Sequence, residues 1–546
     1  MIAARWAATA VLLLAAAMPA AVRRSEPEVE VTGGAVRGYE ASPGAVFKGI
    51  PYAAPPIGAL RWREPQPVLA WRGVRDATEY SAACVQNPIG TAVFIGPLAA
   101  HYGVAYPAPQ WKLSEDCLYL NIWTPEWPMK ESHAVMFWIH GGSNRIGSGN
   151  EPAYSGAELA RHGVVVVTIN YRLGPLGFFE HPALTRESPH HASGNYGLLD
   201  QIAALTWVRD NIAKFGGDPA RVTIFGESAG AIDIGMLLCS PLSHGLFARA
   251  IMESGPVLGI GYAHPLRDGE RFGERVAALA LDGQTGGDVL ARLRSIPAVQ
   301  IRRFYSQAAR QQPDPGFVLD GWLLRRTPQA VFASGGEQPV TILIGNNGRE
   351  ASAFRGGAAA ERLAADQGPI KTLHICYGHL APVAMVAYMI DTHTGRNAAA
   401  DSWLNDALMT CPSAAMATLY AAGGQRAYVY QFLRSIPGRG EAGLGSFHSL
   451  ELPYVFGAMH DSGWSWLPFQ KLDDGLAAII ESYWTNFART GDPNGAGLPH
   501  WKAFTAATAD YLEFAGDGRA IPRQDLHPTF CSLDLAGLKQ RLLDNQ

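Results

Sequence analysis

Short apolar runs recur through the middle of this chain, and each has the length of a buried strand. They lie at 118–122, 135–139, 164–169, 222–225, 250–253, 340–344 and 427–432. Segments with helical spacing separate several of them, most clearly 199–215, where apolar residues recur every three or four positions before Gly216 and Gly217. Strands that alternate with helices predict an α/β fold with a mostly parallel central sheet flanked by helices.

Other segments depart from this alternation. Residues 27–50 alternate in the manner of short antiparallel strands. The segments 260–335 and 352–425 interrupt the strand series with helical patterns, and we expect them to be helical excursions that cover a site. No linker, charge run or repeat of fixed period divides the chain. The expectation is therefore one domain over residues 22–546.

The first residues have the pattern of a secretory signal. Arg5 precedes an apolar run over 6–17, and small residues suited to cleavage follow at 15–21. A membrane anchor is the alternative, but the run is shorter than the ~20 residues needed to span a bilayer. We therefore predict a signal peptide over 1–21, no integral membrane segment in the mature chain, and export to the periplasm or the medium. An oxidising compartment would make the six cysteines candidates for disulfides.

Composition narrows the class of partner. With 48% hydrophobic and 17% charged residues, the chain has the balance of a globular protein with a large core. Its formal net charge of −4 does not favour nucleic acid or an anionic membrane surface. It is compatible with small neutral substrates.

One pentapeptide carries the chemistry. The strand-like run 222–225 stops at Gly226-Glu227-Ser228-Ala229-Gly230, and a helical pattern follows at 231–238. A strand that turns sharply into a helix is a nucleophile elbow, which exposes the serine hydroxyl and needs glycines for the close approach. A Gly-flanked loop is the alternative interpretation. The flanking pattern favours the elbow, which predicts covalent acyl transfer through Ser228.

A serine nucleophile needs a base, an acid that orients the base, and donors for the oxyanion. In elbow hydrolases the acid and the histidine follow the serine in that order. Glu350 follows the strand-like run 341–344, and His448 ends the Gly-rich loop 443–447. For the oxyanion we predict the backbone N–H groups of Gly142, Ser143 and Ala229, because a glycine-rich turn follows the run 135–139.

The chain resembles the type-B carboxylesterases, the family that includes the cholinesterases. The resemblance rests on blocks at 47–53, 115–121, 170–172, 194–201 and 490–493. It implies an α/β-hydrolase fold, no cofactor, and catalytic roles for Ser228, Glu350 and His448. It also implies supporting roles for Glu227, beside the nucleophile, and Ser254, near the acid of the triad. Either residue could instead be a satisfied buried polar group.

The same resemblance implies two disulfides, Cys84–Cys117 and Cys411–Cys531. We expect Cys239 and Cys376 to be buried free thiols. No C-x-x-C or H-E-x-x-H pattern occurs, so no metal is predicted.

Some positions depart from the family pattern. Ser143 and Ser449 stand where the family has glycine, and Asn144 where it often has an aromatic residue. Asn144 and Arg145 suggest a pocket for a polar or carboxylate-bearing acyl group, although solvated loop residues explain them as well. The tryptophan that cholinesterases use for choline is replaced by Pro107, so we do not predict choline specificity.

The expected function is hydrolysis of small-molecule carboxylic esters by a secreted serine carboxylesterase. The same triad could act on an amide, carbamate, lactone, polyester or toxin ester, and a cholinesterase-like binding module without activity is a further alternative. His448 would act as a neutral base. If its pKa is that of an ordinary imidazole, activity should fall as the pH drops through ~6–7.

Overall fold

A computed structural model describes residues 26–106, 109–259, 263–284, 286–312, 314, 316–354, 405–438, 444–460, 463–526 and 531. The predicted signal segment 1–21, Cys376 and most of the excursion 352–425 lie outside these residues. Among the described residues, no helix is both long enough and apolar enough to cross a membrane.

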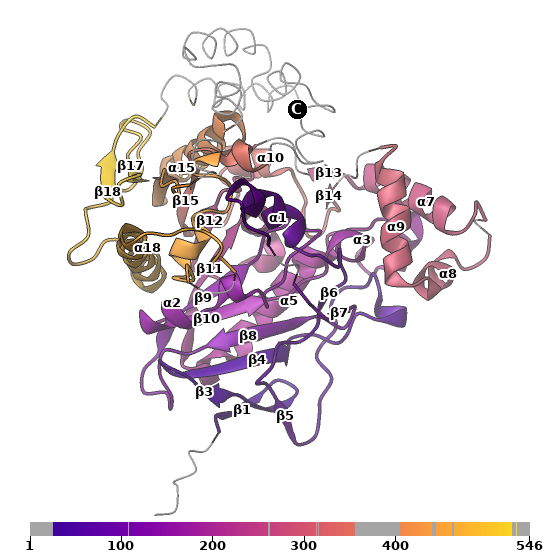
Figure 1. The fold of residues 1–546 in the computed structure, drawn as a ribbon. Helices are drawn as coiled ribbons and strands as arrows, with labels where there is room; N and C mark the ends of the chain where they lie inside the picture. The colour runs from indigo at the N-terminus through magenta and orange to yellow at the C-terminus, as the bar shows by residue number, and fades with distance from the viewer. Residues whose placement is uncertain are drawn as a thin grey trace, which may run out of the picture.

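An eleven-stranded sheet runs through the molecule (Figure 1). In spatial order its strands are β18 (Ala520–Arg523), β17 (Tyr511–Phe514), β16 (Ala427–Phe432), β15 (Thr341–Asn347), β12 (Arg249–Glu253), β11 (Gly217–Glu227), β9 (His133–Ile139), β10 (Val165–Ile169), β8 (Tyr119–Trp123), β4 (Ala45–Pro51) and β3 (Tyr39–Glu40). Strands β17 to β10 pair in parallel, whereas β18 at one edge and β8, β4 and β3 at the other are antiparallel. All seven apolar runs of the sequence are strands of this sheet.

Smaller strands lie outside it. They are β1 (Glu28–Val31), β2 (Gly34–Arg37) and β5 (Val74–Asp76) in one sheet, and the pairs β6 (Ala83–Cys84) with β7 (Leu113–Ser114) and β13 (Ala263–Pro265) with β14 (Phe317–Leu319). The antiparallel pairing predicted within 27–50 is confirmed by β1 with β2 and by β3 with β4.

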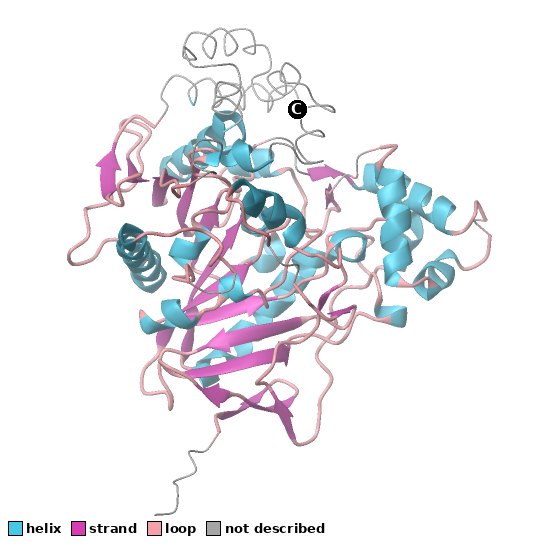
Figure 2. Ribbon diagram, in the orientation of Figure 1, coloured by secondary structure: helices cyan, strands magenta, loops and turns pink. Residues whose placement is uncertain are grey.

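Helices cover both faces of the main sheet (Figure 2). They are α1 (Ala92–His101), α2 (Ala157–Arg161), α3 (Gly174–Gly177), α4 (Pro182–Glu187), α5 (Tyr196–Asn211), α6 (Ala229–Cys239), α7 (Leu266–Ala280), α8 (Val289–Ser295), α9 (Ala298–Ala309), α10 (Pro328–Ala333), α15 (Cys411–Ala422), α17 (Leu452–Val455) and α18 (Lys471–Thr490). The excursion predicted over 260–335 is largely helical, as α7 to α10.

Alternate side chains of the central strands enter two separate cores. On β9, Phe137 belongs to the core that includes Val208 of α5 and Leu237 of α6. Its neighbour Trp138 belongs to the core that includes Ile480 of α18. Successive residues of a strand point to opposite faces, so a sheet covered on both sides needs apolar residues at every position. This double burial explains why the central strands are continuous apolar runs.

Two disulfides tie outer segments to this framework. Cys84 is bonded to Cys117 across 33 residues, and Cys411 at the start of α15 is bonded to Cys531. Among the described cysteines, Cys239 is free as expected, but it is only partly buried. Both bonds have the pairing that the resemblance implies.

Candidate active site

Ser228 lies between β11 and α6 with a backbone φ of +56° and ψ of −123°. A non-glycine residue rarely adopts a positive φ, and a nucleophile elbow holds its serine in this strained form. The surrounding backbone is very close. A Cβ on Gly230 would lie 2.0 Å from the carbonyl oxygen of Ile139, and one on Gly255 would lie 2.2 Å from that of Ser228. Only glycine permits this packing, so the predicted elbow is present.

His448 and Glu350 meet beside this turn. The imidazole Nδ1 lies 2.6 Å from Glu350 Oε2, and both side chains are buried. The other oxygen, Oε1, accepts a hydrogen bond of 2.6 Å from the backbone N–H of Asn347. Glu350 lies three residues after the carboxyl end of β15, where active-site loops of parallel sheets lie. The rings of Phe94 and Phe354 pack against the imidazole at 5.9 and 5.1 Å between centroids.

The second imidazole nitrogen faces Glu227. Nε2 of His448 lies 3.1 Å from Glu227 Oε1, and the same oxygen accepts a 2.7 Å hydrogen bond from the hydroxyl of Ser449. Among the described residues, the hydroxyl of Ser228 has no hydrogen bond to the imidazole. A carboxylate is a stronger acceptor than a hydroxyl, and catalytic hydrogen bonds often tighten only when substrate is bound. Glu227 is therefore a direct partner of the histidine in this structure.

The two carboxylates control the charge of the histidine. Burial lowers the pKa of His448, but Glu227 and Glu350 outweigh it and raise that pKa to about 9. Burial in turn raises the pKa of Glu227, while the neighbouring imidazolium lowers it. The protonated form of His448 is thus more stable than in a free imidazole. The acid limb of activity is consequently expected above the ~6–7 of an ordinary imidazole.

The loop after β9 lies against the elbow and presents backbone N–H groups. Gly142, Ser143 and Asn144 have φ values of +98°, +56° and +55°, and a Cβ on Gly141 would lie 3.1 Å from Ser228 Cβ. Within the described part of the chain, the N–H groups of Gly142, Ser143 and Ala229 donate no hydrogen bond. Successive residues of positive φ form a concave set of donors that suits an anion.

Asn144 and Arg145 differ in their surroundings. The Asn144 amide donates to Asp233 Oδ1 at 2.9 Å and its oxygen accepts from the Tyr171 hydroxyl at 2.9 Å. This side chain is therefore fully engaged by protein groups. Arg145 is 49% exposed and forms an ion pair with Asp314. Of the two polar residues that suggest a polar acyl pocket, only Arg145 has an exposed side chain, and Asp314 already balances its charge.

Ser254 does not contact the predicted acid. Its hydroxyl donates to Glu451 Oε1 at 3.2 Å, and the other oxygen of Glu451 accepts from Asn347. Ser254 is thus connected to Glu350 through Glu451 and Asn347. Sequence reasoning missed both of these residues. A signal was present for Glu451, because it is a lone acidic residue within the apolar segment 450–456 and such a residue needs a buried partner.

Sequence reasoning also missed a second buried carboxylate, that of Glu253, whose backbone contacts the elbow. Glu253, at the end of β12, accepts a 2.8 Å hydrogen bond from the Trp484 indole, and burial raises its pKa to about 8. The backbone N–H of Ser228 donates to the Glu253 carbonyl at 2.9 Å.

No group of three or more His, Cys, Asp or Glu residues within the described ranges has the arrangement of a metal site.

Comparisons with known proteins identify the family of this chain. The model of the "Carboxylesterase family" matches residues 25–529. A fumonisin B1 esterase of Sphingopyxis macrogoltabida is 36% identical over 90% of this chain and 88% of its own length. A human cocaine esterase is 36% identical over 84% of this chain and 81% of its own.

Solved structures show the same similarity. A Geobacillus stearothermophilus carboxylesterase superposes with a TM-score of 0.76 at 34% identity, over 93% of this chain and 99% of its own. A PNB esterase superposes with a TM-score of 0.78 at 31% identity over the same shares. The chain therefore belongs to the carboxylesterase family, with the α/β-hydrolase fold and the activity of a carboxylic ester hydrolase.

Proposed function

We propose that this protein hydrolyses small-molecule carboxylic esters through an acyl-enzyme on Ser228. The observation that carries the proposal is the 2.6 Å contact between His448 Nδ1 and Glu350 Oε2 beside the strained turn at Ser228. A histidine held by a carboxylate next to a serine at a nucleophile elbow is the arrangement of nucleophilic acyl transfer.

The reaction begins when neutral His448 takes the proton of the Ser228 hydroxyl. The imidazole Nε2 exchanges its contact with Glu227 for the serine oxygen, which attacks the ester carbonyl carbon. The N–H groups of Gly142, Ser143 and Ala229 hold the resulting oxyanion.

The tetrahedral intermediate then collapses. The ester C–O bond breaks, and the alkoxide leaves as the alcohol with the proton from imidazolium. Water, deprotonated by the same nitrogen, hydrolyses the acyl-enzyme and releases the acid and free Ser228. Glu350 keeps the proton on Nδ1 and stabilises the imidazolium in both steps.

A deletion of the nucleophile tests this proposal. Ser228→Ala should lower kcat/KM for p-nitrophenyl esters from acetate to decanoate by about 10⁴-fold or more, because triad residues act as a unit. Unchanged turnover by the folded variant would refute it. Matched ester, amide and carbamate substrates then distinguish an esterase from a hydrolase of the other bonds that the same triad can cleave.

We also propose that residues 1–21 direct export. The apolar run at 6–17 with small residues after it supports this proposal, and disulfides such as Cys84–Cys117 persist in oxidising compartments. Cell fractionation and N-terminal sequencing of the processed chain test it. A cytoplasmic protein that retains residues 1–21 would refute it.

A further inference from the structure

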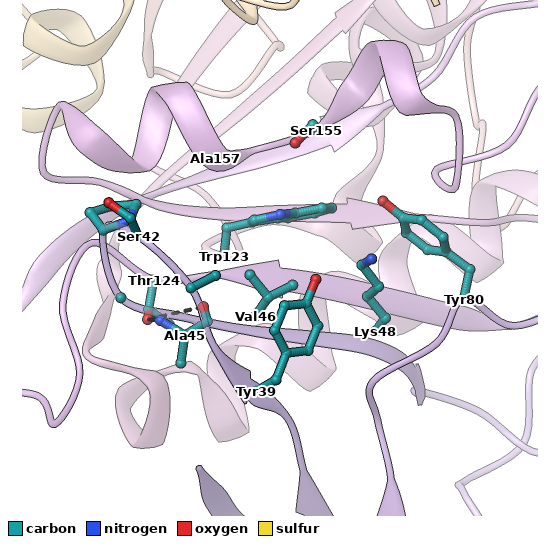
Figure 3. A pocket seen from close by; sticks show the side chains of 13 residues that line it. Tyr39, Ser42, Ala45, Val46, Lys48, Tyr80, Trp123, Thr124, Ser155 and Ala157 are labelled. Carbon is teal, nitrogen blue, oxygen red and sulfur yellow. Dashed lines mark hydrogen bonds between the residues drawn. The ribbon is translucent and has the colours of Figure 1, made fainter. Parts of the chain in front are cut away.

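A cavity of about 170 Å³ opens at the antiparallel edge of the sheet (Figure 3). Its walls come from β3, β4, the turn before β4, the segment between β5 and β6 that carries Tyr80, the end of β8 and the chain up to the start of α2. Strand β8 is the third strand from β11 in the sheet, so this cavity is not part of the site around Ser228. No step of the proposed reaction uses it.

Lys48 provides a positive charge inside this cavity. Its Nζ lies 4.3 Å from the centre of the Tyr80 ring and 5.5 Å from that of Tyr39, and Figure 3 shows it between these two rings. Among the described residues, no carboxylate forms an ion pair with Lys48. Aromatic faces attract a cation but do not neutralise it. The ammonium group can therefore still bind an anion.

The indole of Trp123 offers a second donor in the same wall. The side chain of Trp123 is only 4% exposed, and it lines the cavity. Within the described part of the chain, its indole N–H donates no hydrogen bond to a protein group, and the nitrogen is not among the buried unpartnered atoms, so this N–H remains accessible to solvent. An acceptor bound in the cavity could accept a hydrogen bond from this group.

The remaining surface is mixed: Ser42, Thr124 and Ser155 contribute hydroxyl groups, and part of the wall can pack against a flat apolar body. Ala41, Pro43, Val46 and the Trp123 ring line the cavity together with the two tyrosines. A cavity of about 150 Å³ holds benzene, so this volume admits one substituted ring. The combination calls for a ring that carries a negatively charged acceptor.

We propose that this cavity is a binding site for a small aromatic carboxylate. The ring packs against Trp123 and Tyr39, and the carboxylate accepts hydrogen bonds from the Lys48 ammonium and the Trp123 indole. A charged acceptor matches both donors, whereas a neutral or cationic ring leaves Lys48 uncompensated.

Calorimetric titration of the full chain with benzoate tests the site. We expect saturable binding, and we expect Lys48→Met to weaken it about tenfold or more, because the variant keeps the apolar stem and loses the charge. Lys214→Met is the matched control: Lys214 is an exposed lysine outside the cavity, and its loss should leave benzoate affinity unchanged. Trp123→Phe keeps a ring without the N–H and should weaken binding severalfold.

Two further ligands separate the contributions. Benzyl alcohol has the ring without the charge and should bind about tenfold more weakly than benzoate. Inorganic phosphate has charge without a ring, and equal affinity for it would overturn the assignment of an aromatic ligand. Absence of saturable benzoate binding, or equal affinity in the wild type and a folded Lys48→Met variant, would overturn the site itself. If benzoate bound at Ser228 instead, the wild type and Lys48→Met would bind it with equal affinity.

Discussion

The contact between Glu227 and His448 makes the pH dependence of this enzyme a direct test of its electrostatics. Glu227 Oε1 lies 3.1 Å from His448 Nε2, and both side chains are almost wholly buried. Glu227→Gln keeps the shape of the side chain and an acceptor for the Ser449 hydroxyl, but removes the negative charge. A change in the pKa of His448 would therefore report the charge alone.

The expected size of the change follows from the distance. At an effective dielectric constant of about 20, two unit charges 3.1 Å apart attract by about 5 kcal/mol, an upper bound that corresponds to about 4 pKa units. Burial opposes this attraction, and the pKa of His448 is raised to about 9 in the native protein. We expect Glu227→Gln to lower it by at least about 2 units, toward the ~6.5 of an ordinary imidazole.

The pH profile of kcat/KM for p-nitrophenyl acetate measures this pKa in the free enzyme. The base must be neutral, so activity is present above the pKa of His448 and is lost as the pH falls through it. The wild-type limb is expected near pH 9 and the limb of Glu227→Gln near pH 7 or below. The position of the limb, not the level of the plateau, is the deciding measurement.

A neighbouring carboxylate gives the control. Glu253 is equally buried, but it bonds to the Trp484 indole and not to the imidazole. Glu253→Gln should move the acid limb far less than Glu227→Gln. Coincident limbs in the wild type and in Glu227→Gln would refute the electrostatic reasoning.

Two changes test the framework of the fold. Gly230→Ala forces a Cβ to within 2.0 Å of the Ile139 carbonyl oxygen and should lower the free energy of unfolding by about 3 kcal/mol or more. Gly475, within α18, has open space around it, so Gly475→Ala should raise the free energy of unfolding by up to ~1 kcal/mol. Equal thermal midpoints would contradict this. Replacing Cys84 and Cys117 by serine opens a 33-residue loop and should cost ~3–4 kcal/mol in urea unfolding; an unchanged midpoint would exclude a stabilising bond.

The sequence by itself determined the sheet and the turn that carries the serine. The runs at 135–139 and 222–225 are apolar at every position because both faces of their strands are buried, and that pattern is local. The elbow is local too, since Gly226 and Gly230 each lie two positions from Ser228. His448 and Glu350 followed from chain order and resemblance, and the structure places them in contact.

The tertiary structure alone decided which buried polar groups meet. Ser449, which replaces a family glycine, takes a φ of +70° and binds Glu227, although 222 residues separate them. Ser254 bonds to Glu451 and not to Glu350, and the Asn144 amide turns to Asp233.

These partners, and the cavity around Lys48, are assembled from segments far apart in the chain. The hydrophobic pattern around a residue indicates whether its side chain is buried. Its hydrogen-bond partner depends on which other buried group the packing of the sheet and helices brings within about 3 Å, and no local periodicity records that choice.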